Sequence, residues 1–154
     1  MLPGPTRRTA AQALLWMVMA VPLFMSLAGL AIDGGALLDS RRQLQSVADG
    51  AARAGATRLD MVRLRASGGS DIALDPSLAT QAAQAYVDRS LLMTAHSWDA
   101  TPGTEIEVGQ RRVHVLLHAN VQTAFLRIVF IDTVPVEATA YADLQFGIHD
   151  GSGG

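Results

Sequence analysis

Two residue types, cysteine and lysine, are absent from this chain, and each absence excludes a class of function. No cysteine occurs among the 154 residues, so disulfides, thiolate metal sites and a cysteine nucleophile are excluded. Lysine is absent too, which excludes the phosphate-binding loop that depends on a lysine. The formal net charge is −2, whereas nucleic-acid-binding domains usually carry a basic patch. We therefore expect no nucleic-acid partner.

Patterns for catalysis and metal binding are scarce as well. The sequence contains neither Gly-x-Gly-x-x-Gly nor Gly-x-Ser-x-Gly. His114 and His118 are four residues apart, but in a strand they would lie about 13 Å apart, too far to share a metal ion. Glu105 and Glu107 alternate with apolar residues and are interpreted as surface carboxylates. We expect no catalytic residue, no cofactor and no metal site, and we predict that the protein is not an enzyme.

The most informative feature that is present is a run of twenty residues, 13–32, without a charged side chain. This is about the length that a helix needs to cross the hydrocarbon core of a bilayer. Its Leu, Val, Phe and Ile residues together contribute about −3 to −5 kcal/mol to insertion. A cleaved signal peptide and a buried core helix are the alternatives. The run exceeds the apolar region of about 7–15 residues in a signal peptide, which favours an uncleaved membrane anchor.

Charged residues on both sides of the run indicate its orientation. Arg7 and Arg8 precede it closely, and a second arginine pair follows it at a greater distance. The positive-inside rule therefore favours a cytoplasmic N-tail, residues 1–12, and an extracytoplasmic C-terminal part of a single-pass inner-membrane protein. Asp33 follows the run directly. We interpret it as a boundary residue that reaches water, or as the partner of a cation on a neighbouring subunit.

A helical pattern continues beyond the apolar run. Apolar residues between Leu37 and Val62 recur mostly three and four positions apart, which is typical of an amphipathic helix. We expect one continuous helix from about Ala10 to about Met61. Residues 33–65 are assigned to its continuation outside the membrane, with Asp49 on a solvated face.

The rest of the chain changes its pattern twice. Glycine and serine indicate a flexible linker at residues 66–74. Asp75 is the expected N-cap of a second helix that starts at Pro76 and ends near Met93.

Alternating apolar residues then predict three strands. They lie at 105–108, 113–121 and 134–146, with a hairpin turn at 109–112. A short helix is expected at 123–130. The predicted fold is therefore α+β and pilin-like, with a long N-terminal transmembrane helix, a second helix and a small antiparallel meander. The second helix and the meander form a C-terminal domain, 75–148, before a disordered tail, 149–154.

Two stretches of the long helix carry a family resemblance. Gly29–Asp33 reads GLAID, and Arg42–Ala56 reads RQLQSVADGAARAGA. These stretches resemble the N-terminal region of TadE/TadG-like proteins of the tight-adherence (Flp, type IVc) pilus system. The resemblance covers about residues 9–56 and implies a minor pilin or pseudopilin, with pilin-like subunits or pilus-assembly proteins as partners. The alternative is an anchored binding or scaffolding module of a secretion complex that does not enter a filament.

Small residues in the long helix are candidates for assembly contacts. Small side chains allow two helices to approach closely, so we expect this helix to pack against neighbouring rods. The candidate residues for helix packing and assembly are Gly29, Gln45, Ala48, Asp49, Ala51, Ala52, Gly55 and Ala56.

Overall fold

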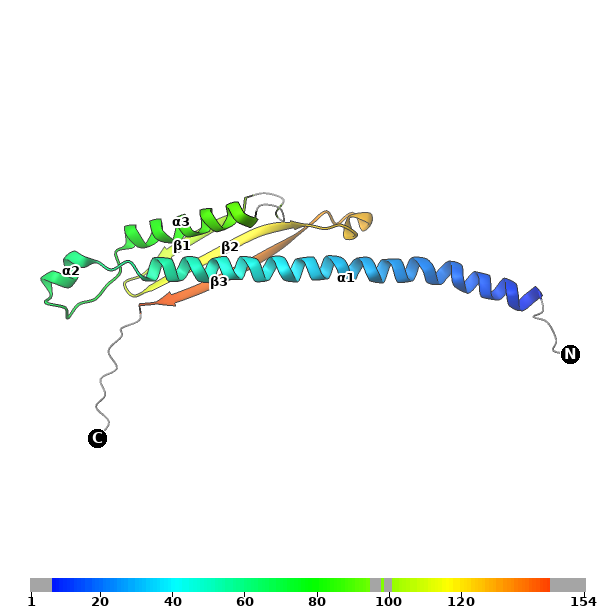
Figure 1. Ribbon diagram of the computed structural model, residues 1–154, viewed down its shortest axis with the longest axis horizontal. Helices are drawn as coiled ribbons and strands as arrows, with labels where there is room; N and C mark the ends of the chain where they lie inside the picture. Colours follow the sequence, from blue (N-terminus) through cyan, green and yellow to red (C-terminus); the bar gives the residue numbers. More distant parts are fainter. Residues whose placement is uncertain (1–6, 95–97, 99–100, 145–154) are drawn as a thin grey trace, which may run out of the picture.

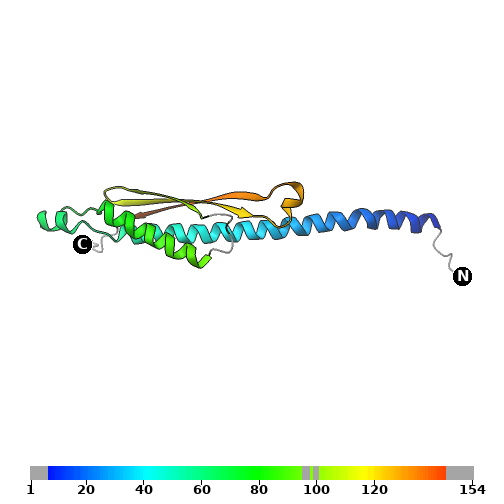
Figure 2. The same cartoon turned by 90° about the horizontal axis from the view of Figure 1, so that it is seen from above.

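One long helix determines the shape of the molecule. A computed structural model describes residues 7–94, 98 and 101–144. Helix α1 spans Arg7–Ala56 and contains 50 residues, so it is about 75 Å long. Figures 1 and 2 show the other elements gathered along its C-terminal half, while its N-terminal half projects alone. The predicted α+β class with a long N-terminal helix is confirmed.

Helix α1 ends earlier than the sequence pattern predicts. Leu59 leaves the helix to form a β-bridge with Leu74, and the Asp60 N–H donates to the Ala73 carbonyl over 2.9 Å. The Asp60 carboxylate then accepts from two backbone N–H groups and caps a separate short helix, α2, at Met61–Ala66. The expectation of one helix up to about Met61, within a continuation to residue 65, is therefore wrong beyond Ala56.

The segment predicted as a flexible linker, 66–74, is a hydrogen-bonded return. The Gly69 N–H donates to the Leu64 carbonyl over 2.9 Å, and the Ser67 hydroxyl accepts the Asp71 N–H at 3.0 Å. Gly68 and Gly69 have φ angles of +64° and +91°, which glycine adopts without steric cost. The segment starts with the last residue of α2 and leads directly into the next helix.

Helix α3 spans Pro76–Thr94 and follows the prediction closely. The Asp75 carboxylate accepts the N–H groups of Ser77 and Leu78 at 2.9 and 3.0 Å, so Asp75 is the N-cap. Proline occupies the first helical position, where its missing N–H costs no hydrogen bond.

The three strands form the predicted antiparallel meander in the order β1-β2-β3. Strand β1 covers Gly103–Val108, β2 covers Arg112–Gln122 and β3 covers Thr133–Asp143. The 3₁₀ helix η1, Leu126–Val129, forms part of the expected short helix between β2 and β3. The predicted end of the third strand near residue 146 and the tail 149–154 lie outside the described residues.

The core lies between α1, α3 and one face of the sheet. Apolar residues at alternate positions of β2 and β3 face the two helices, as the period-two pattern predicts. Strand β2 runs antiparallel to α1, because Val113 at its start lies against Gly55 while Phe125 beyond its end lies against Gly29. The β2–β3 connection, residues 123–132, is thus beside the middle of α1 (Figure 1). The largest fully buried side chains are Leu44, Leu117, Val87, Val113 and Val115.

Candidate functional site

The N-terminal half of α1 exposes its apolar side chains. From Leu14 to Ile32 the large apolar side chains are 54–69 % exposed. The most apolar window of α1 has a mean hydropathy of 2.1, and within the described residues α1 is the one helix that could cross a membrane by length and composition. Pro22 does not end the helix, and the Ser26 hydroxyl donates to the Pro22 carbonyl over 2.8 Å. Such a surface fits lipid or other helices better than water.

The residues chosen from the sequence to orient and bound the span lie at the two ends of this half. Arg7 is the first residue of α1, and Arg8 follows in the same turn. Asp33 lies at the other end, one residue after the apolar run, where the covering domain begins.

The carboxylate of Asp33 is buried and fully engaged by the chain itself. Asp33 is 2 % exposed. Its carboxylate accepts the backbone N–H groups of Ala124 and Phe125 at 2.9 Å each, and that of Leu126 at 2.6 Å. The expectation that the Asp33 side chain reaches water or pairs with a cation of a neighbouring subunit needs correction, because its carboxylate is buried and binds backbone N–H groups of its own chain. Asp33 instead holds the β2–β3 connection onto α1. Its place at the boundary of a membrane span stays a prediction.

This contact is a helix cap supplied from a distance. No side chain within the η1 segment caps its N-terminus. The N–H groups that open a helical turn need an acceptor, and a carboxylate is favourable there. Asp33 supplies it from more than ninety positions earlier in the chain. Sequence reasoning missed Ala124, Phe125 and Leu126; the available signal was an uncapped helical segment together with an aspartate at the end of an apolar run.

Gly29 allows the connection to approach α1 closely. A Cβ atom at position 29 would lie 2.8 Å from the Cβ, Cγ and Cδ1 atoms of Phe125, closer than real side chains come. Gly29 is one turn of the helix before Asp33, on the same face. The two residues therefore form one contact site, the junction, in which glycine makes room and aspartate binds.

The β2–β3 connection is also closed at its own base. The Thr123 N–H donates to the Asp132 carbonyl over 3.0 Å. The Thr123 hydroxyl, which is largely buried, donates to the carbonyls of Ile131 and Asp132. These bonds hold the two ends of the connection together, so it is presented to its surroundings as a structured loop.

The small residues selected for assembly lie inside the chain's own core. Ala48, Ala51 and Ala52 are almost completely covered, and Ala56 packs against the same cluster. A Cβ atom on Gly55 would lie 3.1 Å from the Ala79 carbonyl oxygen of α3. The expectation that this stripe packs against neighbouring rods needs correction, because α3 and the sheet already occupy it. Small residues do allow close helix contact here, but within one chain.

The two polar candidates of α1 lie at the margin of that core. Gln45 donates to the Asp49 carboxylate over 3.1 Å and to the Thr139 carbonyl of β3 over 2.9 Å. Asp49 is half-buried, so it is not on a fully solvated face as expected. Gln45 therefore contributes to holding β3 against the helix.

The outer face of the sheet carries polar and charged side chains. His114 stacks on Tyr141 with 4.4 Å between ring centroids and lies 3.4 Å from Glu107. Arg112 and Asp143 form an exposed ion pair at 2.6 Å, and its hydrogen bond lowers the pKa of Asp143 below its usual value. Among the described residues, no group of three or more histidine, aspartate or glutamate side chains converges as a metal site would require.

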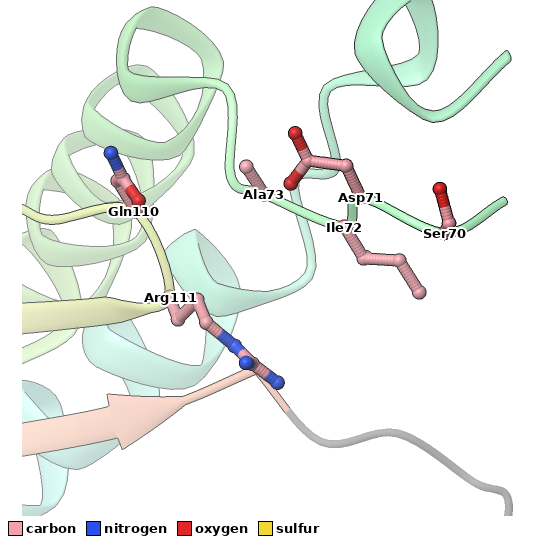
Figure 3. Close-up of a pocket in the computed structure, with 6 residues that line it drawn as sticks. All are labelled: Ser70, Asp71, Ile72, Ala73, Gln110 and Arg111. Atoms are coloured by element: carbon pink, nitrogen blue, oxygen red, sulfur yellow. The ribbon is translucent and has the colours of Figure 1, made fainter. Parts of the chain in front are cut away.

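A hollow of about 400 Å³ lies at the far end of the domain from the junction. Figure 3 shows the return segment with Asp71 on one side of it and the β-hairpin turn with Gln110 and Arg111 on the other. Asp71 is already paired with Arg63 at 2.6 Å. The hollow is open, and the side chains around it do not converge on a common point.

Comparison with known proteins agrees with the resemblance found in the sequence. Residues 11–58 match the family described as "Putative Flp pilus-assembly TadE/G-like". The matched segment is nearly the whole of α1, including its exposed apolar half, the junction residues on the helix and the buried small-residue stripe. No match was found among curated proteins or among solved structures.

Proposed function

Because residues 11–58 are a TadE/G-like segment of the kind found in Flp pilus assembly, we propose that this chain is a membrane-anchored, minor-pilin-like component of that system. It acts as a structural protein and not as an enzyme. Helix α1 is its anchor, and the α3–sheet domain is the part displayed outside the membrane.

One observation carries the proposal: a single unbroken helix changes its environment at the junction. Before Gly29 its apolar side chains are exposed, and after Asp33 its apolar face is covered by α3 and the sheet. A soluble protein rarely exposes an apolar surface of this extent. The change therefore supports an inner half that contacts lipid or neighbouring helices and an outer half that supports a domain.

The orientation follows from charge. The arginine pair at Arg7 and Arg8 opens α1 close to the apolar run, whereas the pair that follows the run, Arg41 and Arg42, lies farther from it. We propose that the N-terminus lies in the cytoplasm and that the domain lies outside the inner membrane.

Contacts with other subunits must use a surface that the chain leaves uncovered. The small-residue stripe from Ala48 to Ala56 is occupied by the chain's own domain. We propose that the exposed half of α1, residues 12–32, makes the helix-to-helix contacts in assembly. Its small residues Ala20, Ser26 and Ala28 allow another helix to approach.

The proposal is tested in a deletion strain that expresses tagged variants of the chain. Imaging of surface pili and blotting of sheared filaments and membranes are the two readouts. Leu23→Arg places a charge near the middle of the span, which costs roughly 2.5–3.5 kcal/mol of insertion energy. Leu38→Arg is the matched control, since Leu23 and Leu38 are 60 % and 58 % exposed on the same helix.

We expect the wild-type chain and Leu38→Arg to fractionate with membranes and to restore pili, and Leu23→Arg to do neither. Restoration of pili by Leu23→Arg would contradict an anchored role. Tagged protein in the sheared filaments indicates a pilin-like subunit. Retention of all tagged protein in the membrane indicates the anchored scaffolding module instead.

A further inference from the structure

The β2–β3 connection exposes apolar side chains that the other described elements leave uncovered. Ile128 is 74 % exposed and Phe130 is 93 % exposed, with Phe125 and Ile131 partly exposed beside them. Phe130 also has a φ of +65°, a conformation that bulky residues rarely adopt. An exposed cluster of this kind on a loop held in one conformation indicates a contact surface.

The position of the connection along α1 identifies what it faces. Asp33 binds three of its backbone N–H groups, and Gly29 lies against Phe125. Gly29 is three residues inside the end of the apolar run, which corresponds to about 5 Å along the helix axis. The connection is therefore level with the last turn of the span. It is the end of the domain nearest to the exposed half of α1 (Figures 1 and 2).

The composition of the connection fits the boundary between lipid headgroups and acyl chains. Amphipathic segments at this boundary bury their apolar side chains about 5–10 Å deep. Phenylalanine and isoleucine supply that surface here, and Arg127 supplies a positive charge beside them. An arginine at this depth reaches the headgroup phosphates while its stem packs among the apolar side chains.

We propose that the β2–β3 connection inserts Ile128 and Phe130 into the headgroup region of the bilayer that α1 spans. The domain then touches the membrane at two places, the span and this loop, with the junction joining them. Two contacts fix the rotation and tilt of the domain above the membrane, whereas one helix alone would leave both free. This inference rests on the proposed anchoring by α1.

The absence of cysteine makes a direct test possible, because each introduced cysteine is unique. Three single variants of the full chain carry a nitroxide label: Ile128→Cys in the connection, Leu23→Cys in the span and Val62→Cys in α2. Val62 is the matched control, being 79 % exposed at the far end of the domain. The proteins are reconstituted into vesicles of phosphatidylethanolamine and phosphatidylglycerol. Electron paramagnetic resonance then compares label collisions with oxygen, which is enriched in lipid, and with a water-soluble nickel chelate.

We expect the Leu23 label to report lipid, the Val62 label to report water, and the Ile128 label to shift from the Val62 value towards the Leu23 value. An Ile128 label that matches Val62 while Leu23 reports lipid would overturn this inference and leave the anchor intact. A Leu23 label that reports water would overturn the anchor and this inference together. Dipolar broadening between Ile128 labels without lipid contact would assign the loop to a second copy of the chain and overturn the lipid assignment.

Discussion

The two halves of α1 have similar lengths and form one continuous helix, but their apolar side chains have different surroundings. The inner half exposes large side chains such as Leu23 all around the helix. The outer half confines its buried residues, such as Leu44 and Ala51, to one stripe and covers them with its own domain. A helix that is apolar on every side requires an apolar environment, whereas a helix with one stripe requires one partner. At the junction of Gly29 and Asp33, α1 changes from a helix that requires an apolar environment to one that requires a single covering partner.

The comparison also separates two uses of small residues. In the outer half, Ala48, Ala52 and Gly55 let α3 and the sheet approach within one chain. In the inner half, Gly29 lies against Phe125, whereas Ser26 and Ala28 are exposed. The same residue types therefore predict packing in both halves, but only their location shows whether the partner belongs to the same chain.

The largest effect on the stability of the domain is expected at Gly55, where α3 and the sheet both lie against the outer half of α1. Gly55→Leu places a side chain against the Ala79 carbonyl and Val113, at positions where even a Cβ atom lies 3.1 Å away. We expect a loss of about 3 kcal/mol or more in the unfolding free energy of the domain, because backbone and core atoms must both move. Denaturant unfolding in detergent micelles measures it.

Ser46→Leu is the matched control, since Ser46 is exposed on the same half of the helix. We expect both variants to fractionate with membranes, because neither substitution lies in the proposed span. Equal stability of Gly55→Leu and the wild type would contradict the close contact within the chain and restore the small-residue stripe as a surface for other rods.

The second-largest effect is expected at the contact between Asp33 and the β2–β3 connection. Asp33→Ala leaves the N–H groups of Ala124, Phe125 and Leu126 without their acceptor. Hydrogen exchange at these three amides should accelerate at least about ten-fold, since bonds to a charged acceptor are among the stronger ones. Asp39→Ala is the control, because Asp39 is exposed and bonds with Gln43 of its own helix. Unchanged exchange in Asp33→Ala would mean that the connection does not depend on this cap.

A smaller effect on stability is expected when a glycine of the junction and a nearby glycine of the same helix are each replaced by alanine. Gly29→Ala forces Phe125 away from α1 and should destabilise the domain by about 1–2 kcal/mol. Gly34→Ala meets no atom within 4 Å and should stabilise the helix by up to about 1 kcal/mol. Opposite shifts of the unfolding midpoint are expected from one chemical change placed five residues apart. Shifts of the same sign would contradict the close approach at Gly29.

The smallest effect is a dependence of stability on pH. The hydroxyl of Ser77 and the N–H of Leu78 lower the pKa of Asp75, and Arg112 lowers that of Asp143. Both pKa values are lower in the folded than in the unfolded state, so the stabilisation is present above about pH 4 and is lost as pH falls through the folded-state values. The double variant Asp75→Asn with Asp143→Asn should show a flatter acid dependence of its unfolding midpoint. An unchanged acid dependence would exclude these two groups as its source.

The sequence is informative where its signals are local. The uncharged run 13–32 predicts the membrane span. The alternation of apolar and polar residues predicts β2 with its buried face from Val113 to Val121, and Asp75 with Pro76 predicts the start of α3. Each of these signals lies within a few residues of the structure that it specifies. The early end of α1 is a partial exception, because the bridge between Leu59 and Leu74 overrides a helical pattern that continues past Ala56.

The contacts that define the junction could not be predicted in the same way. Asp33 and its donors are more than ninety residues apart, and a single sequence gives no register between them. For the small-residue stripe the sequence predicts neighbouring rods as the partner, whereas the structure buries it in the chain's own core. Ala48 and Ala51 suit a helix of the same chain as well as one of another chain, so the sequence alone does not identify the partner.

The most direct test of the account compares two leucines on one helix. Leu23 and Leu38 are almost equally exposed, at 60 % and 58 %, but lie on opposite sides of the junction. Leu23→Cys and Leu38→Cys are treated in spheroplasts with a thiol reagent that cannot cross the membrane. We expect Leu38→Cys to react and Leu23→Cys to stay unmodified until the membrane is dissolved with detergent. Equal reaction at both positions in intact spheroplasts would contradict the proposed membrane span.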